Sequence, residues 1–183
     1  MGSGIIVCGL NGVGKSTLGR ALAEKLHYHF IDNEDLYFPK TDPNYLYAVS
    51  RTREEVESLL LSEIEAHEHL VFAAVKGDHE KALPFFKYAV LIEAPRDIRL
   101  RRVKERSFRK FGDRMLPGGD LYEQEQSFFD LISSRAENFV EEWIRSFSGQ
   151  VIRIDGTKPI DENIDFIMRQ LQCTTVTPIF QNS

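Results

Sequence analysis

The sequence predicts an α/β protein built on a doubly wound parallel sheet. Five short apolar runs are continuous rather than alternating, as strands covered on both faces are, and they span residues 5–8, 28–31, 70–75, 88–92 and 151–154. Between these runs, apolar residues recur at helical spacing, and a glycine-rich stretch follows the first run. Strands and helices that alternate along a chain are typical of a three-layer α/β fold.

Four helices are expected from the spacing of their apolar residues. In chain order, the residues that mark them are Leu18, Leu22 and Leu26; Val56, Leu60 and Ile64; Ile132, Ala136, Val140, Trp143 and Phe147; and Ile160, Ile164, Ile167 and Leu171. Pro95 follows the fourth strand, and Pro159 opens the last helix. The stretch MLPGGD, residues 115–120, predicts a loop between two polar helical stretches.

Length and composition predict one soluble domain, residues 1–173, with a tail over residues 174–183. A net charge of -5 argues against general binding to nucleic acid. No apolar run approaches the roughly 20 residues that cross a bilayer, so we expect a cytoplasmic protein without membrane contact. Cys8 and Cys173 are too far apart in sequence to predict a disulfide framework or a metal-binding spacing. The oligomeric state is not readable from the sequence.

The stretch GLNGVGKST after the first strand carries the most specific motif in the chain. Gly9, Gly14, Lys15 and Ser16 fit the pattern G-x-x-x-x-G-K-[ST], in which glycines let successive backbone amides point toward a phosphate. The following helix adds the partial positive charge of its N-terminus. Lys15 would reach the β and γ phosphates, and the Ser16 hydroxyl would bind Mg²⁺. The predicted nucleotide-binding residues are Gly9, Asn11, Gly12, Val13, Gly14, Lys15, Ser16 and Thr17.

This loop, in this position of a short α/β chain, resembles that of the P-loop kinases of small molecules and nucleoside monophosphates. In general plan the chain is nearest to shikimate and gluconate kinases. The resemblance implies a P-loop NTP hydrolase fold with strand order 2-3-1-4-5, and ATP with Mg²⁺ as cofactors. It also implies an acceptor-binding insert at about residues 36–66 and a helical lid at about residues 104–122. The segment 154–159 looks like the loop that packs over adenine in these kinases.

Two acidic residues follow the second strand, at the sheet edge where open α/β proteins bind ligands. Phosphate transfer to a hydroxyl needs a carboxylate near the acceptor oxygen, to orient it, to accept its proton or to hold the metal. We therefore expect Asp32 to serve the acceptor and the metal, and Asp35 to contact the acceptor. Asp32 would equally suit an N-cap, with Asp35 in a first helical turn.

Cations predict the rest of the acceptor site. Arg53 in the insert and Lys76 after the third strand would suit an anionic acceptor, but either would also suit a solvated surface. Shikimate kinases carry a glycine-rich turn where this chain has the single glycine Gly77, which weakens that resemblance on the substrate side. Arg135 resembles the arginine that binds substrate or phosphate after the lid of these kinases. His79 is expected on the surface.

Basic residues crowd the segment from Arg96 to Arg114, which overlaps the expected lid. Cations delivered by a closing flap stabilise a phosphoryl group in transfer and exclude water. Arg106, Arg109 and Arg114 are therefore candidates, with Arg106 and Arg109 assigned to catalysis alongside Lys15 and Asp32. A solvated charged face is the alternative for any one of them.

The favoured function is an ATP-dependent kinase with a small hydroxyl-bearing acceptor. A nucleoside monophosphate kinase is the first alternative. Such an enzyme needs an arginine that binds the α-phosphate of the acceptor and a pocket for its base, and the sequence assigns neither. A P-loop ATPase or a non-catalytic nucleotide-binding protein is the second. Glu93 after four apolar residues is only a poor Walker B candidate, because no aspartate precedes it and Pro95 follows.

Overall fold

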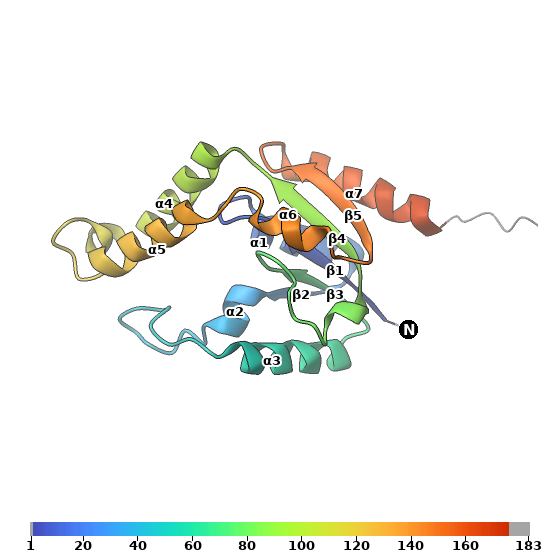
Figure 1. Ribbon diagram of the computed structural model, residues 1–183, viewed down its shortest axis with the longest axis horizontal. Coiled ribbons are helices and arrows are strands. Elements are labelled where there is room, and N and C mark those ends of the chain that lie inside the picture. The colour runs from blue at the N-terminus through green and yellow to red at the C-terminus, as the bar shows by residue number, and fades with distance from the viewer. Residues whose placement is uncertain (1, 176–183) are drawn as a thin grey trace, which may run out of the picture.

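A five-stranded parallel sheet forms the centre of the molecule in the computed structural model, which describes residues 2–175. The strands are β1 (Ser3–Cys8), β2 (His29–Asp32), β3 (His69–Ala73), β4 (Phe86–Glu93) and β5 (Gln150–Asp155). Their order is β2-β3-β1-β4-β5, which confirms the expected order 2-3-1-4-5. The strand at the centre, β1, therefore delivers the residues that follow it to the middle of the sheet's carboxyl edge (Figure 1).

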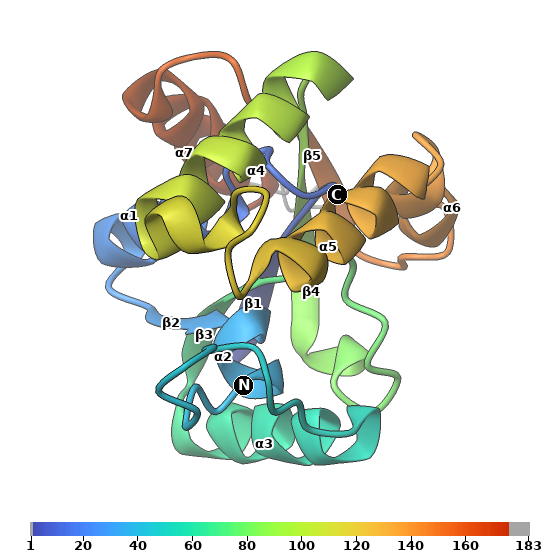
Figure 2. The same ribbon diagram turned by 90° about the vertical axis from the view of Figure 1, so that its left-hand side faces the viewer.

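Helices cover both faces of this sheet and extend beyond it. They are α1 (Lys15–Leu26), α2 (Asn33–Tyr37), α3 (Arg53–Ala66), α4 (Arg96–Phe111), α5 (Tyr122–Ser134), α6 (Phe139–Ile144) and α7 (Ile160–Thr175), with 3₁₀ turns η1 (Leu83–Phe85) and η2 (Gly112–Met115). Figure 2 shows α1 and α7 to the left of the strands and α6 to the right. The helices α4 and α5 project past the sheet on the side away from the N-terminus (Figure 1).

Two apolar clusters, one on each face, explain why the strands read as continuous apolar runs. Within β1, Ile6 and Cys8 belong to a cluster that includes Leu60 of α3. Ile5 and Val7 belong to the opposite cluster, whose helical members are Leu18 and Leu22 of α1 and Ile164 and Ile167 of α7. Successive side chains of a strand point to opposite faces, so a strand covered on both sides carries no polar alternation. The predicted three-layer class is confirmed.

One predicted helix is wrong as a continuous element. The apolar spacing from Ile132 to Phe147 suggested a single helix, but α5 ends at Ser134 and α6 begins at Phe139. Arg135 has extended backbone at the break, with φ −63° and ψ 131°. Two hydrogen bonds to other elements surround this break. The side chain of Arg135 donates to Asn11, and the side chain of Arg96 donates to the carbonyl of Ser133 in α5 at 2.6 Å. These long-range contacts outweigh the local helical pattern.

The described part of the chain ends in α7, which includes residues 174 and 175 of the predicted tail. The rest of that tail, residues 176–183, lies outside the described residues. Cys8 is buried and free, and burial raises the pKa of its thiol to about 12. Such a thiol stays protonated and behaves as a small core side chain.

Candidate active site

The glycine-rich loop connects β1 to α1 at the middle of the sheet's carboxyl edge. It is anchored at both ends, since the amide of Gly9 donates to the carbonyl of Val75 at 3.1 Å and the amide of Leu18 donates to the carbonyl of Gly14 at 3.0 Å. Gly14 is the N-cap of α1 and has a φ of 102°, a conformation that disfavours any side chain. The loop thus curls directly into a helix N-terminus, as phosphate-binding loops do.

Gly12 fixes the loop against α4. Its φ is 86°, and a Cβ added there would lie 2.2 Å from the carbonyl oxygen of Arg99. Arg99 is itself buried, with only 4% of its side chain exposed, and it donates to both carboxylate oxygens of Glu137 at 2.7 Å. The extra glycine of the motif therefore permits backbone-to-backbone packing between the loop and the first turn of α4.

A cavity of about 330 Å³ opens over this loop. Its lining comes from three places in the chain: the loop and the start of α1, the arginines of α4, and the connection from β5 to α7. These residues include Gly12, Val13, Gly14, Lys15, Ser16 and Thr17; Arg102, Arg106 and Arg109; and Ile154, Gly156, Lys158, Ile160 and Asn163. We call it the phosphate cavity. The segment expected to pack over adenine, residues 154–159, contributes part of this wall.

A larger cavity of about 650 Å³ lies on the other side of the loop, against Arg99, Glu137 and Arg153. Neither Lys15 nor Ser16 lines it. The smaller phosphate cavity is therefore the one with the chemistry that a nucleotide tail requires, despite its size.

Lys15 carries a strongly perturbed pKa. Its Nζ donates to the carbonyl of Leu10 at 3.1 Å. Desolvation is the largest cause that lowers its pKa, to about 8, and the nearby charge of Arg106 lowers it further, while Asp32 opposes them. Because desolvation is the largest cause, the low pKa records chiefly that the ammonium is removed from water. An anion bound beside the ammonium would stabilise its charged form.

Asp32 lies at the carboxyl end of β2, as expected, and it also serves as the N-cap of α2. Its Oδ1 accepts a hydrogen bond from the amide of Glu34 at 3.0 Å. The capping alternative is therefore confirmed, and the functional role stays a prediction; Asp32 also interacts electrostatically with Lys15. Next to it, the side-chain Oδ1 of Asn33 is buried without a hydrogen-bond partner. Oxygen donors of this kind, with the Ser16 hydroxyl in the phosphate cavity, suit a hard cation such as Mg²⁺.

The arginines of α4 form one stripe. Arg99, Arg102, Arg106 and Arg109 recur at intervals of three or four residues, which puts them on one face of a helix. Arg102 donates to the carbonyls of Gly12, at 3.4 Å, and Gly156, at 3.0 Å, and so joins the loop to the β5–α7 connection. Sequence reasoning gave Arg102 no role, although the helical period alone would have grouped it with Arg106 and Arg109.

Arg114 lies away from the phosphate cavity. It forms a salt bridge with Asp120 at 2.6 Å and donates to the carbonyl of Asn44 at 2.8 Å. It therefore connects the expected lid to the expected acceptor insert. The proposed contact between Arg114 and a transferring phosphate receives no support from this geometry.

The three predicted acceptor cations gather on one side of the loop. Lys76 lies 3.3 Å from a carboxylate oxygen of Asp78, and Arg53 pairs with the same oxygen at 3.8 Å. Lys76 and Arg135 both contact the ring of Phe139, at 4.5 and 5.4 Å from its centroid. Arg53 pairs with Asp78 from another segment rather than with Glu54 or Glu57 of its own helix.

Arg135 links this cation cluster to the phosphate loop. Its guanidinium donates to Oδ1 of Asn11 at 2.5 Å, and desolvation lowers its pKa. The extended backbone at Arg135 is what lets a residue between α5 and α6 reach the loop after β1.

Asp35 points to a different set of partners. It pairs with Lys40, which also lies 3.6 Å from Glu34, and 58% of the Asp35 side chain is exposed. Neither of the two cavities described so far includes Asp35 in its lining. Asp35 and Asp32, three residues apart, are thus not brought together as a pair.

A third cavity, of about 210 Å³, lies between the segment after α2 and the helices α4 and α5, and we call it the aromatic cavity. Its lining residues are Glu34, Phe38, Tyr45, Tyr47, Arg106, Ser107, Lys110, Glu125 and Phe128. Arg106 therefore lines both this cavity and the phosphate cavity. Sequence reasoning missed Glu125, which is separated from Tyr45 by 80 positions along the chain.

Glu125 is the most unusual side chain of this cavity. It is 2% exposed, its Oε1 accepts from the hydroxyl of Tyr45 at 2.9 Å, and its Oε2 is buried without a partner. Desolvation raises the pKa values of Tyr45 and Tyr47, and so do the carboxylates beside their hydroxyls, Glu125 for Tyr45 and Glu34 for Tyr47. Both hydroxyls therefore remain protonated. A buried carboxylate oxygen without a partner is costly unless a ligand donates to it.

His79 corrects a sequence expectation. It was expected on the surface, but it is 3% exposed and its ring lies 6.0 Å from that of Phe72 in the core. Burial lowers the pKa of its imidazole. The loop after β3 folds back on the sheet, which no local signal in the sequence indicated.

The sequence matches a known protein family and a bacterial relative. The family model described as AAA domain matches residues 5–114, more than half of the chain. The uncharacterized protein YqaC of Bacillus subtilis (strain 168) is 29% identical over 182 residues, covering 93% of this chain and 98% of that protein. Over residues 2–175, no helix has the length and apolar character needed to cross a membrane.

Solved structures share the fold. A shikimate kinase from Acinetobacter baumannii, in complex with shikimate, has a TM-score of 0.59, 18% identity and 97% coverage of both chains. A deoxyadenosine kinase from M. mycoides has a TM-score of 0.54 and 16% identity, covering 93% of this chain and 99% of that one. A gluconokinase from Sinorhizobium meliloti has a TM-score of 0.53 and 18% identity, covering 94% and 93%. The chain therefore belongs to the AAA domain family of P-loop proteins and has the fold of the small-molecule and nucleoside monophosphate kinases.

Proposed function

We propose that the chain is an ATP-dependent phosphotransferase that moves the γ-phosphate of ATP to a hydroxyl of a small-molecule acceptor. The observation that carries this proposal is the shared wall at Arg106: one arginine lines both the phosphate cavity and the aromatic cavity. A nucleotide tail in the first cavity and an acceptor in the second would meet at its guanidinium. The kinase-like fold supports the same class of reaction.

The nucleotide would occupy the phosphate cavity. Loop amides from Gly9 to Thr17 and the ammonium of Lys15 would bind the phosphates, while backbone groups of residues 154–159 would contact the base. Ser16 and Asp32 would hold Mg²⁺, which supplies charge neutralisation at the phosphates when it is bound. The buried ammonium of Lys15 and the nearby positive charge of Arg106 support an anionic occupant.

The acceptor would lie between Asp32 and the aromatic cavity. Asp32 would orient the acceptor hydroxyl and take its proton as the new O–P bond forms and the bond from the γ-phosphorus to the bridging oxygen of ADP breaks. Arg106 and Arg109 would stabilise the charge that spreads over the phosphoryl oxygens. ADP and the phosphorylated acceptor would then leave when the segment from about residue 104 to 122 opens.

The lining of the aromatic cavity favours a particular kind of acceptor. The rings of Phe38, Tyr45 and Tyr47 offer flat apolar surface. The Oε2 atom of Glu125 can accept a hydrogen bond and has no donor. A flat group with an N–H or O–H at its edge would satisfy both. The cations Arg53, Lys76 and Arg135 would contact an anionic part of the same molecule, whereas Asp35 would contact it only after releasing Lys40.

This chemistry also supports the second candidate, a nucleoside monophosphate kinase. A nucleobase is flat and carries edge N–H donors, so the aromatic cavity would serve as the base pocket that the sequence did not reveal. The α-phosphate of such an acceptor would need an arginine grip, for which Arg53 and Arg135 are the available residues. The two candidates differ in the acceptor and share the nucleotide site.

The test is ADP release measured with a panel of nucleoside monophosphates, nucleosides, sugar acids and other hydroxylated metabolites. We expect one class to raise ADP release far above the water-only background. Lys15→Ala should abolish turnover, and Asp32→Asn should retain ATP binding but lose transfer. Glu125→Gln should raise KM for the acceptor, while the matched control Glu123→Gln, an exposed residue of the same helix, should not.

Three outcomes would reject parts of this proposal. ADP release that no acceptor stimulates, at any concentration, indicates an ATPase. Absence of both ATP binding and turnover removes the nucleotide site. Equal activity in Asp32→Asn excludes Asp32 from the chemistry.

A further inference from the structure

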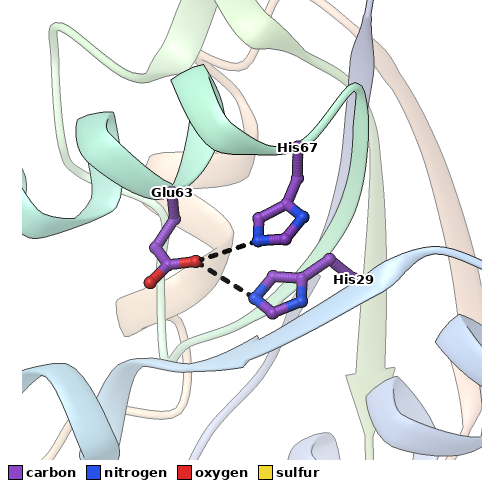
Figure 3. Close-up of side chains that lie close together, drawn as sticks. All are labelled: His29, Glu63 and His67. Carbon is purple, nitrogen blue, oxygen red and sulfur yellow. Dashed lines mark ion pairs between the residues drawn. The ribbon is translucent and has the colours of Figure 1, made fainter.

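A compact group of potential metal ligands lies outside the three cavities described above. Glu63 and His67 are in and just after the last turn of α3, four residues apart, and His29 begins β2, the edge strand of the sheet. Figure 3 shows both imidazoles directed at one carboxylate oxygen of Glu63. The loop that binds phosphate follows the carboxyl end of β1, whereas His29 lies at the amino end of a parallel strand, so the two sites lie at opposite edges of the sheet.

The distances suit a tetrahedral metal ion. Nε2 of His29 lies 3.1 Å from Oε2 of Glu63, and Nε2 of His67 lies 3.5 Å from the same oxygen. One ligand atom from each of the three residues can be chosen so that all lie within 4.8 Å of one another. A tetrahedral zinc ion with bonds of about 2.0–2.1 Å holds neighbouring ligand atoms about 3.3 Å apart. The three ligand atoms are therefore close enough to bind one ion once the two imidazole rings rotate about their side-chain torsions.

The two imidazoles lie side by side. Their rings are stacked, with centroids 3.7 Å apart and planes within 8° of parallel. An imidazole lone pair lies in the plane of its ring, so the rings must rotate out of this stack before both Nε2 atoms can bind one ion. The i, i+4 spacing of Glu63 and His67 keeps both on one face of the helix end.

We propose that His29, Glu63 and His67 bind a divalent transition-metal ion, with Zn²⁺ as the best match. Two imidazole nitrogens and one carboxylate oxygen are a ligand set that zinc accepts, with water in the fourth position. The N–H of each imidazole then resides on Nδ1, which frees Nε2 for the metal. About two fifths of each side chain is exposed, 38% for the histidines and 39% for Glu63, so an ion can reach the site from solvent.

The role that follows is a clamp rather than a catalyst. A bound ion would join the C-terminal end of α3 to the edge strand β2. The same helix begins at Arg53, one of the cations proposed for the acceptor, so zinc would steady the acceptor-side helix from its far end. Because the ion binds the folded arrangement, it should raise the melting temperature of the whole chain.

The test is calorimetric titration of the full chain with ZnCl₂ after removal of metals by a chelator, combined with thermal unfolding at each zinc concentration. We expect one zinc ion per chain at the described site and a rise in melting temperature. His29→Ala and His67→Ala should each weaken zinc binding at least about tenfold and abolish the thermal shift. Glu63→Gln should also weaken binding.

Two controls separate this site from the phosphate cavity. Glu65→Gln changes an exposed residue of the same helix turn, and Ser16→Ala removes the proposed Mg²⁺ ligand; both should bind zinc as the unaltered chain does. Unchanged zinc affinity in both histidine variants, or no zinc binding to the unaltered chain, overturns the proposal. Neither result would bear on the proposed kinase reaction, which uses other residues.

Discussion

Lys15 is the residue whose charge a bound nucleotide would change most. In the protein without nucleotide, desolvation and Arg106 hold its pKa at about 8, well below the usual 10.5. A phosphate beside the ammonium would favour the charged form and raise that pKa. Near pH 8 the amine is about half deprotonated, so nucleotide binding should be accompanied by proton uptake.

The first prediction concerns this linkage. At pH 8, binding of ATP should take up roughly half a proton per site, and affinity should fall as the pH rises above 8 because more of Lys15 must then be protonated. Calorimetry in buffers of different ionisation enthalpy measures the uptake. Lys15→Arg is the control, since arginine stays charged and should show no such uptake. Binding heats that do not depend on the buffer would contradict the low pKa.

The second prediction compares two glycines of the loop by thermal unfolding without nucleotide. Gly14→Ala introduces a side chain at positive φ in open space, which should cost about 1–2 kcal/mol. Gly12→Ala adds an overlap with the Arg99 carbonyl and should cost about 1–3 kcal/mol more. Equal destabilisation by the two variants would show that the loop does not pack against α4 as described.

Single residues were also where sequence reasoning was least complete. The motif predicted Lys15 and Ser16 because the role proposed for them depends on local spacing, and both line the phosphate cavity. Glu125 and His79 carried no such signal. Both side chains are buried, and Glu125 Oε2 lacks a hydrogen-bond partner, because of contacts between segments that are distant in the sequence. Burial of a polar side chain is a tertiary property, and a single sequence does not record it.

At the scale of elements, α4 is the helix that lies between the phosphate cavity and the aromatic cavity and lines both. Arg99 anchors its first turn, Arg102 holds the loop to the β5–α7 connection, and Arg106 faces both cavities. The sequence indicated a basic helix in this region but not which face would be used. The interval of three or four residues between these arginines specifies that face once the helix is known to continue to Phe111.

The third prediction belongs to this helix. Arg106→Met should raise the pKa of Lys15, because a positive neighbour is removed, and should lower kcat by about 10²–10³ if Arg106 stabilises the transferring phosphate. NMR of the lysine side chains measures the first effect, and ADP release measures the second. Arg101→Met is the control, because Arg101 is exposed and pairs with Glu105 of its own helix. An unchanged Lys15 pKa in Arg106→Met would remove Arg106 from the site.

The elements themselves were largely predictable, with informative exceptions. Continuous apolar strands follow from burial on two faces, and the bounds of all five strands lie within two residues of those expected. The break between α5 and α6 was not predictable, because it depends on Arg135 reaching Asn11 across 124 positions of sequence. Local periodicity reports the apolar face of a segment and not the long-range contact that interrupts it.

At the scale of the whole molecule, the fold brings residues from both halves of the chain to one edge of the sheet. The loop after β1, Asp32 at the end of β2 and Lys76 after β3 lie at one edge because parallel strands end at the same edge. The segment between α2 and α3 meets η2 and α5 through contacts such as Tyr45 with Glu125 and Arg114 with Asn44. Parallel topology made the edge predictable, whereas the partner contacts above it were not.

The central claim is that the γ-phosphate passes from the phosphate cavity to a small molecule held beside it. The most direct measurement is incubation of the protein with γ-labelled ATP, Mg²⁺ and a protein-free extract of small metabolites, followed by separation of the labelled products. The account predicts a labelled organic phosphate that appears with the unaltered chain and not with Lys15→Ala. Label found only in inorganic phosphate, or left entirely in ATP, would contradict it.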